Sequence, residues 1–291
     1  MTPWQEHAHI FACEGERLLG IATLPHAAED VGVLIIVGGP QYRAGSHRQF
    51  TLLARQLAED GIASFRFDYR GMGDSEGEAR TFESVDKDIR AAIDAFAAIQ
   101  PTLKRFVLWG LCDAASAALM YGASDARVAG MVLLNPWVHS ETAEAKARLH
   151  RYYPARILNA SFWRKVFKLK FAFRAALKEF AGFIRQGAQP EARGDQNYIQ
   201  RMLNGLKTYQ GKILILLSGH DDLTVQEFST LISNNPDWCT ACQAPHLSSL
   251  TLHGATHTFS SHQWRVQVGA WTGTWIRNQI SKDEQASSEI S

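Results

Sequence analysis

Short apolar runs alternate with helical patterns along most of the chain, and this alternation constrains the fold more than any other feature. Six apolar runs have the length of buried strands: 32–39, 62–71, 104–110, 128–137, 212–219 and 248–254. Helical patterns follow four of them, at 46–60, 82–99, 113–122 and 260–280. The segments HAHIFACEG and RLLGIATLP predict a leading hairpin. The alternation predicts an α/β fold with a mostly parallel sheet flanked by helices, and with functional residues beyond the carboxyl ends of the strands.

One interval breaks this rhythm. About 75 residues separate the strands expected at 128–137 and 212–219, which is far more than a single crossover helix needs. Residues 138–207 are therefore predicted to be an insertion, a helical cap or lid. The predicted core combines the flanking segments 1–137 and 208–281. The polar tail that follows, 282–291, is predicted to be disordered.

Composition excludes several classes of protein. The 291 residues carry a formal net charge of +1 and are 46% hydrophobic, which argues against disorder in the bulk of the chain and against a globally basic nucleic-acid-binding protein. There is no run of 18 apolar residues and no visible secretion signal at the N-terminus. Four cysteines are too few for a disulfide scaffold, so we expect a reduced, cytoplasmic protein.

The predicted insertion is basic, whereas the rest of the chain is acidic. Residues 141–207 hold 14 Lys or Arg against 5 Asp or Glu. Within them, 160–184 contains seven aromatic residues, several at helical spacing. Three interpretations remain open for this segment: an apolar lid over the active site, a basic amphipathic helix in peripheral contact with anionic lipid, or a docking surface for a partner.

The pentapeptide 110–114 (GLCDA) is the first candidate for chemistry. It stands where a strand meets a helix, and such a turn exposes its central side chain while crowding the backbone on either side. Gly110 and Ala114 are the small residues that this crowding requires, and Cys112 is a nucleophile at the centre. The N–H of Asp113 could stabilise an oxyanion. The alternative is a buried cysteine that only packs at a strand end.

Two later segments supply the partners that a nucleophile needs. His257 follows the last strand, where it could deprotonate the cysteine, whereas His253 lies inside that strand. After the preceding strand, Asp222 could orient the histidine, with Asp221 as the fallback. The order nucleophile, acid, histidine is the order expected in an α/β-hydrolase.

The chain resembles α/β-hydrolases from about residue 10 to 280. The turn DYRGMGDS resembles the D-x-R-G-x-G-x-S turn of lipase-like and peptidase-like members. The blocks VGGPQYRAGSHRQF, RFDYRGMGDSEG, LWGLCDAASA and LLNPWV resemble the exosortase A system-associated hydrolase 1 family, which occurs in bacteria that sort PEP-CTERM proteins and make exopolysaccharide. The cysteine also resembles that of the dienelactone hydrolases, which use a Cys-Asp-His triad.

The chain departs from this pattern in three ways. The common nucleophile is serine, and here it is Cys112. The charge of Asp113 beside it would raise the pKa of the thiol. Pro40 stands where the second oxyanion donor is expected and has no N–H, so Gln41 or a nearby backbone N–H must serve. In the DYRGMGDS turn, a structural role is favoured for Arg70 and Asp74.

These features predict hydrolysis of a carboxylic ester or thioester by a Cys112–His257–Asp222 triad, without a cofactor. The expected substrate is a small molecule with an acyl or lipid-linked portion, and the expected location is the cytoplasm, with peripheral contact at the inner membrane through 160–184. The alternatives are an acyltransferase to a sugar or protein hydroxyl, and a non-catalytic binding or scaffold protein. No metal is expected, because the pair Cys239 and Cys242 has no second pair. The oligomeric state stays open.

Overall fold

The computed structural model describes residues 3–39, 41–138, 198–219 and 222–280. The chain divides into two compact units, Met1–Val138 together with Asp195–Ser291, and His139–Gly194. The second unit lies outside the described residues, so the description below concerns the first.

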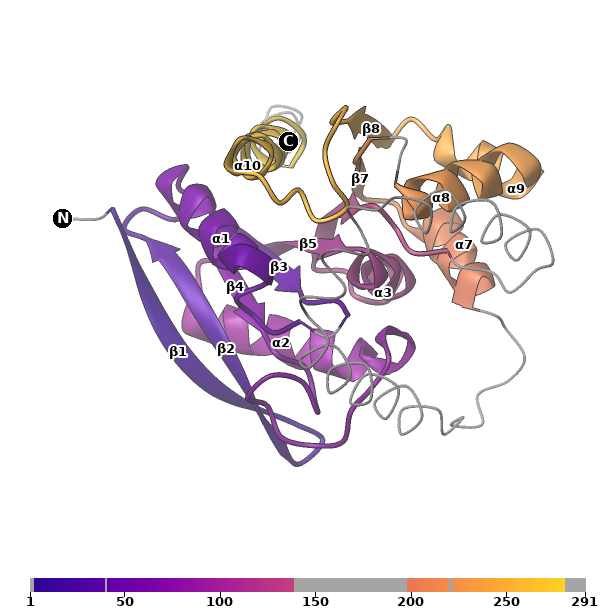
Figure 1. Ribbon diagram of the computed structural model, residues 1–291. Coiled ribbons are helices and arrows are strands. Elements are labelled where there is room, and N and C mark those ends of the chain that lie inside the picture. The colour runs from indigo at the N-terminus through magenta and orange to yellow at the C-terminus, as the bar shows by residue number, and fades with distance from the viewer. Residues whose placement is uncertain (1–2, 40, 139–197, 220–221, 281–291) are drawn as a thin grey trace, which may run out of the picture. The chain divides into compact units, whose positions relative to one another are not determined.

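The described part is built on an eight-stranded sheet with the order β1-β2-β4-β3-β5-β6-β7-β8 (Figure 1). β1 and β2 form the expected antiparallel hairpin, β2 runs antiparallel to β4, and all other neighbours are parallel. The strands are β1 Trp4–Cys13, β2 Glu16–Pro25, β3 Val31–Ile36, β4 Ala63–Phe67, β5 Arg105–Leu111, β6 Val128–Leu134, β7 Lys212–Leu217 and β8 Leu247–Thr251.

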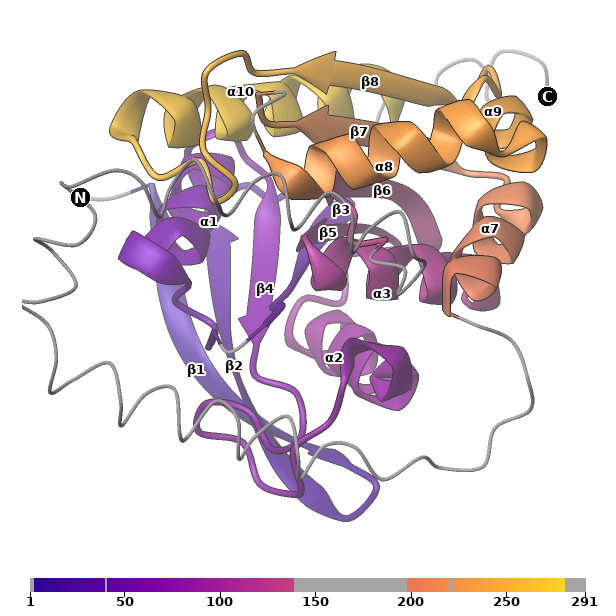
Figure 2. The ribbon, with the colours of Figure 1, turned by 45° about the vertical axis from the view of Figure 1, so that its right-hand side comes forward.

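Helices cover both faces of this sheet (Figure 2). One face carries α1 and α10, and the other carries α2, α3, α7, α8 and α9. The helices are α1 Gln49–Glu59, α2 Asp86–Ile99, α3 Asp113–Tyr121, α7 Tyr198–Thr208, α8 Leu223–Asn234, α9 Pro236–Cys242 and α10 His262–Gln279. The predicted mostly parallel α/β architecture is confirmed.

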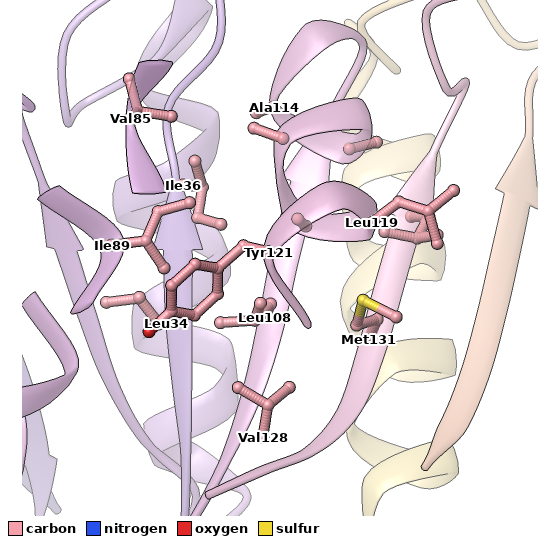
Figure 3. Close-up of a cluster of buried hydrophobic side chains, with 14 of the residues drawn as sticks. Leu34, Ile36, Val85, Ile89, Leu108, Ala114, Leu119, Tyr121, Val128 and Met131 are labelled. Atoms are coloured by element: carbon pink, nitrogen blue, oxygen red, sulfur yellow. The ribbon is translucent and has the colours of Figure 1, made fainter. Parts of the chain in front are cut away.

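Burial on both faces explains why the central strands are apolar without alternation. In β3, Val33 and Ile35 pack toward α1 and α10, whereas Leu34 and Ile36 pack toward α2 and α3. Figure 3 shows part of the hydrophobic cluster that contains Leu34 and Ile36, in which side chains from β3, β5 and β6 pack against those of α2 and α3. Packing on both faces therefore fixes the positions of the carboxyl ends of the parallel strands.

The boundary of the insertion differs from the one predicted. Residues 195–207 belong to the same compact unit as the core, and α7 lies within them and extends to Thr208. α7 buries Met202, Leu203 and Leu206 in the cluster that also contains the apolar side of α3. Residues 195–207 were predicted to belong to the insertion because the sequence predicts no strand between 138 and 211. The absence of a strand signal does not indicate whether a helix in that interval packs on the sheet.

Two helices between β7 and β8, α8 and α9, were not predicted. Cys239 and Cys242 lie in α9, and all four cysteines of the chain are free. Among the described residues, no helix is long and apolar enough to cross a membrane. The segments 160–184 and 282–291, for which the sequence analysis made predictions, lie outside the described residues.

The DYRGMGDS turn has the structural role that was favoured for it. Asp68 is fully buried and accepts hydrogen bonds from the backbone N–H groups of Arg43 and Asp74. Arg70 and Asp88 form a buried pair, in which Arg70 Nη2 lies 2.8 Å from Asp88 Oδ2. The Asp68 contacts hold the turn after β4 against the loop after β3, and the Arg70–Asp88 pair holds it against the start of α2. Arg70 is therefore already neutralised by a protein carboxylate.

Candidate active site

The turn between β5 and α3 holds Cys112 in a strained backbone conformation. Cys112 has φ 63° and ψ −123°, in a region that non-glycine residues rarely adopt. Its N–H donates to Leu134 O at 2.8 Å, and its carbonyl accepts from Ala115 N at 3.0 Å. Neighbouring strand β6 and the first turn of α3 thus impose the conformation. The side chain is only partly buried, at the carboxyl end of β5.

The small residues around Cys112 are required by close backbone contact. A Cβ atom at Gly110 would lie 2.6 Å from the carbonyl carbon and oxygen of Ala114. Ala114 itself is 1% exposed, so neither β5 nor α3 can move away to make room for a larger side chain. The crowding that the sequence analysis inferred from residue size is present.

The surroundings of the Cys112 sulfur favour the neutral thiol. Burial and, to a smaller extent, the charges of Asp113 and Asp222 together raise the pKa of Cys112 to about 12, and a hydrogen bond from the backbone N–H of Asp113 opposes them. The thiol is therefore protonated at neutral pH. Its reaction as a nucleophile needs a base that removes the proton as the new bond forms.

The carboxylate of Asp113 connects the Cys112 turn to the loop after β3. Its Oδ2 accepts from Gly39 N at 2.8 Å, and its Oδ1 accepts from Ala114 N at 2.9 Å. Gly38 allows this approach, because a Cβ there would lie 2.1 Å from Asp113 Oδ1. Burial raises the pKa of Asp113 against the effect of these two hydrogen bonds. The Gly39 N–H is thereby occupied and cannot donate to an oxyanion in this arrangement.

The structure brings His257 and Asp222 together from two different loops. His257 follows β8 and Asp222 follows β7, and His257 Nδ1 lies 2.8 Å from Asp222 Oδ2. The side chain of Asp222 is 9% exposed and that of His257 is 34% exposed. The carboxylate is thus shielded, while the imidazole remains accessible.

Asp222 is held in place as an ionised carboxylate. Burial by itself would raise its pKa, but the pKa is lowered overall by the contact with His257 and by hydrogen bonds from Ser218 and Thr224. Ser218 Oγ donates to Asp222 Oδ2 at 2.7 Å, and Thr224 N donates to Oδ1 at 3.0 Å. Asp222 is also the N-cap of α8. The alternative acid, Asp221, lies outside the described residues.

Asn135 is a buried residue of this site that the sequence analysis did not assign a role. It follows β6, and its Nδ2 donates to the carbonyl of His257 at 2.9 Å. Its Oδ1 accepts from Ser218 N at 2.8 Å. One fully buried amide therefore joins the loops that carry His257 and Asp222. The signal in the sequence is a polar residue that directly follows a wholly apolar strand.

Gln41 uses its side-chain oxygen within its own loop. Oε1 accepts from Ser46 N at 3.1 Å and from Gln49 Nε2 at 3.3 Å. These bonds attach the loop to the beginning of α1. Pro40, whose missing N–H raised the question of the second oxyanion donor, lies outside the described residues.

Cys112 and His257 share no hydrogen bond among the residues that the structure describes. The charge of Asp222 nevertheless acts on the Cys112 thiol, and that of His257 acts on the Asp113 carboxylate. Cys112, Asp222 and His257 follow β5, β7 and β8, so all three lie at the carboxyl edge of the sheet.

No cluster of three metal-ligating side chains occurs within the described ranges. The candidate site there consists of a cysteine in a strained strand-to-helix turn, a histidine–aspartate pair and backbone N–H groups.

The strand order, the strained turn after β5 and the placement of the acid and the histidine after β7 and β8 define an α/β-hydrolase fold. The family model described as serine aminopeptidase, S33, matches residues 29–231, and the chain belongs to that family. None of the curated proteins matches the sequence.

Solved structures with the same fold include several esterases. An esterase of Pyrococcus furiosus superposes with a TM-score of 0.69 at 15% identity, over 95% of this chain and 92% of its own. An esterase of Butyrivibrio proteoclasticus with bound ferulic acid gives 0.62 at 19% identity, over 94% and 100%. A dienelactone hydrolase of Anabaena variabilis gives 0.60 at 14% identity, over 95% and 99%. At these identities the likeness concerns the fold.

Proposed function

We propose that the protein hydrolyses carboxylic esters or thioesters, with Cys112 as nucleophile, His257 as base and Asp222 as the residue that orients His257. The observation that carries the proposal is the 2.8 Å contact between His257 Nδ1 and Asp222 Oδ2, at the sheet edge that also holds the strained Cys112 turn. A carboxylate on Nδ1 leaves the other ring nitrogen free to accept a proton.

The proposed reaction has two steps. As Cys112 Sγ attacks the carbonyl carbon, its proton passes to His257, and the backbone N–H of Asp113 donates to the oxyanion. The protonated imidazole then gives the proton to the leaving alcohol or thiol, which leaves a thioester on Cys112. Water attacks this thioester while His257 takes its proton. The C–S bond then breaks, His257 returns the proton to Cys112 Sγ, and the carboxylic acid departs, so that the thiol is restored.

The raised pKa of the partly buried Cys112 thiol determines when its proton is removed. Because the pKa of Cys112 is raised to about 12, a preformed thiolate is scarce at neutral pH. Proton transfer to His257 must therefore accompany the attack, which requires an unprotonated imidazole. The second oxyanion donor in this scheme is Gln41 or a neighbouring backbone N–H of the loop after β3.

The pathway is proposed from the resemblance to the exosortase A system-associated hydrolase 1 family. It suggests a cytoplasmic enzyme of a bacterium that sorts PEP-CTERM proteins and makes exopolysaccharide. The basic aromatic segment 160–184 supports a substrate with an acyl or lipid-linked portion, and peripheral contact with anionic lipid. Co-sedimentation with vesicles containing anionic lipid, compared with neutral vesicles, tests this contact.

The test of the catalytic proposal is hydrolysis of p-nitrophenyl acetate and of a short acyl thioester. Cys112→Ala and His257→Ala should each lower kcat/KM by roughly 1,000-fold or more. Ser233→Ala, in the exposed part of α8, is the matched control and should leave the rate unchanged. Circular dichroism checks that all variants are folded. Hydrolysis that survives in Cys112→Ala would refute the assignment and favour a binding protein.

A further inference from the structure

A pocket lies apart from the Cys112 turn, against β1, β2 and β4. These strands are side by side at one edge of the sheet (Figure 1). The pocket has a volume of about 390 Å³ and is lined by Glu6, Ala8, Ile21, Tyr42, Arg43 and Arg66, among others. Ala8 pairs with Ile21, and Ile21 pairs with Arg66, so the three form a row across the strands. Cys112, His257 and Asp222 do not contribute to its lining.

Arg66 is buried in this pocket with most of its hydrogen-bonding capacity unused. The residue is 6% exposed, and its Nη2 donates to Glu6 Oε1 at 2.6 Å. Its Nε is buried and has no hydrogen-bond partner in the described part of the chain. A guanidinium has five N–H donors, and a buried donor without an acceptor is costly. Nε is too deeply buried for a ligand to reach, but Nη1, which also has no hydrogen-bond partner in the described part of the chain, is a donor that a ligand in the pocket could meet.

Three carboxylates match three guanidinium groups around the pocket, but they are shared unevenly. Glu6 is shared, because its Oε2 also accepts from Arg55 Nη2 at 2.6 Å. One carboxylate thus faces two guanidinium groups. Arg43 also lines the pocket, but it is paired with Asp68 and Asp74. Burial lowers the pKa of Arg66, the charges of Arg55 and Arg43 lower it further, and Glu6 opposes them.

The walls of the pocket are apolar. Ala8 and Ile21 come from the sheet, and the ring of Tyr42, a residue that is 51% exposed, lies on the loop after β3. A ligand that matches both the Arg66 guanidinium and the apolar walls would carry one acceptor group for Arg66 and a small apolar body. A dianion such as phosphate fits less well, because Glu6 lines the same pocket and repels the second charge.

We propose that this pocket binds a small organic monocarboxylate, whose oxygens accept hydrogen bonds from Arg66 while its apolar body lies between Ala8, Ile21 and Tyr42. The volume is within the range of small-molecule sites, roughly 300–1,000 Å³. This proposal is independent of the hydrolase activity proposed for Cys112.

The probe for the experiment is 4-fluorobenzoate, titrated into the full-length protein and followed by fluorine NMR. We expect saturable binding with a dissociation constant on the order of 1 mM. The neutral isostere 4-fluorobenzamide should bind at least ~10-fold more weakly, because it lacks the charge. Inorganic phosphate should compete only weakly with 4-fluorobenzoate. An absence of saturation at 20-fold the expected constant, or equal binding of the amide, would overturn the proposal.

Two arginines that share Glu6 provide a matched pair of variants. Arg66→Gln removes the donors in the pocket and should weaken binding by ~10-fold or more. Arg55→Gln removes the other partner of Glu6 but does not alter the lining, so binding should stay within ~3-fold. Ala8→Phe, on the exposed side of β1, fills the pocket without changing charge and should also abolish binding. It keeps the test decisive if Arg66→Gln fails to fold.

The Cys112→Ala variant distinguishes this pocket from the proposed active site. The variant should bind 4-fluorobenzoate with unchanged affinity. Loss of binding in Cys112→Ala, or equal losses in Arg66→Gln and Arg55→Gln, would show that the probe occupies another place and would refute the proposal.

Discussion

At the scale of single residues, Asp113 differs most from what its position suggests. The residue after a nucleophile contributes its backbone N–H to the oxyanion hole. Here its side chain also accepts from Gly39 N at 2.8 Å, so it holds the loop after β3 against the turn. The same carboxylate raises the pKa of Cys112. Asp113 thus positions the loop after β3, and its negative charge disfavours the thiolate form of Cys112.

Asp113→Asn separates these two effects. The amide keeps one acceptor for Gly39 but carries no charge, so the pKa of the Cys112 thiol should fall. A fall of about one unit would raise the rate of alkylation by iodoacetamide at pH 8 about tenfold. The measurement is the alkylation rate at Cys112 from pH 6 to 10, followed by mass spectrometry because the other three cysteines are also free, and it does not depend on any substrate. Asp74→Asn, at a charge that is largely exposed, is the control. A profile displaced to higher pH in Asp113→Asn would contradict the argument.

At the scale of elements, the junction of β5 and α3 determines where Cys112, the proposed nucleophile, lies. The strand ends in Gly110 and Leu111, and the helix begins directly after Cys112, without a connecting loop. Such a junction is tight because strand and helix backbones must pass each other within contact distance. The positive φ of Cys112 and the close approach of Gly110 to Ala114 are two consequences of the same geometry.

Gly110→Ala should therefore destabilise the protein by about 3 kcal/mol, at the upper end for overpacking, because a Cβ would lie 2.6 Å from backbone atoms of Ala114. Gly15→Ala is the comparison, since Gly15 has φ 91° in the β1–β2 turn with no atom within 4 Å of an added Cβ. It should cost only about 1–2 kcal/mol for its backbone conformation. Urea unfolding of the two variants measures both values. Equal losses would show that close contact at the junction is unimportant.

At the scale of the whole molecule, the described part depends on ionised carboxylates that are bound by arginine or histidine. Hydrogen bonds from Arg127 hold the pKa of Asp125 at about 2 against the effect of burial. The pKa values of Asp222 and Glu6 are lowered as well. A carboxyl group with a lowered pKa stabilises the fold above its unfolded value, about 4, and this contribution is lost as pH falls toward the folded value.

The urea midpoint should therefore fall as pH is lowered from 5 to 2. Asp113 has the opposite sign, because its raised pKa contributes stability at low pH that is lost as pH rises, but it is one group against five in the described part, since the pKa values of Glu14 and Glu76 are lowered too. Arg127→Gln should reduce the pH dependence, since Asp125 then loses its main partner. A midpoint that is constant or higher at pH 3 than at pH 6 would contradict this prediction.

Most of the fold could be predicted because the spacing of apolar residues along the chain indicates which short segments are buried, and on how many faces. The strands near 32–39, 104–110 and 212–219 are apolar throughout, as buried parallel strands are, and the structure places β3, β5 and β7 there. α8 and α9 were not predicted because, at 12 and 7 residues, they are too short to show a clear helical period. The end of the insertion was predicted at 207 because a helix that packs on the sheet has no strand signature.

Periodicity and spacing in the chain thus determined the sheet, its hairpin and the three positions at which a nucleophile, an acid and a histidine could stand. Only the tertiary structure decided which groups touch: His257 with Asp222, Asn135 with both of their loops, and Asp113 with Gly39. The physical reason is that burial periodicity is a property of neighbouring residues. A hydrogen bond between Gly39 and Asp113 depends on strand order and register, which a local pattern does not encode.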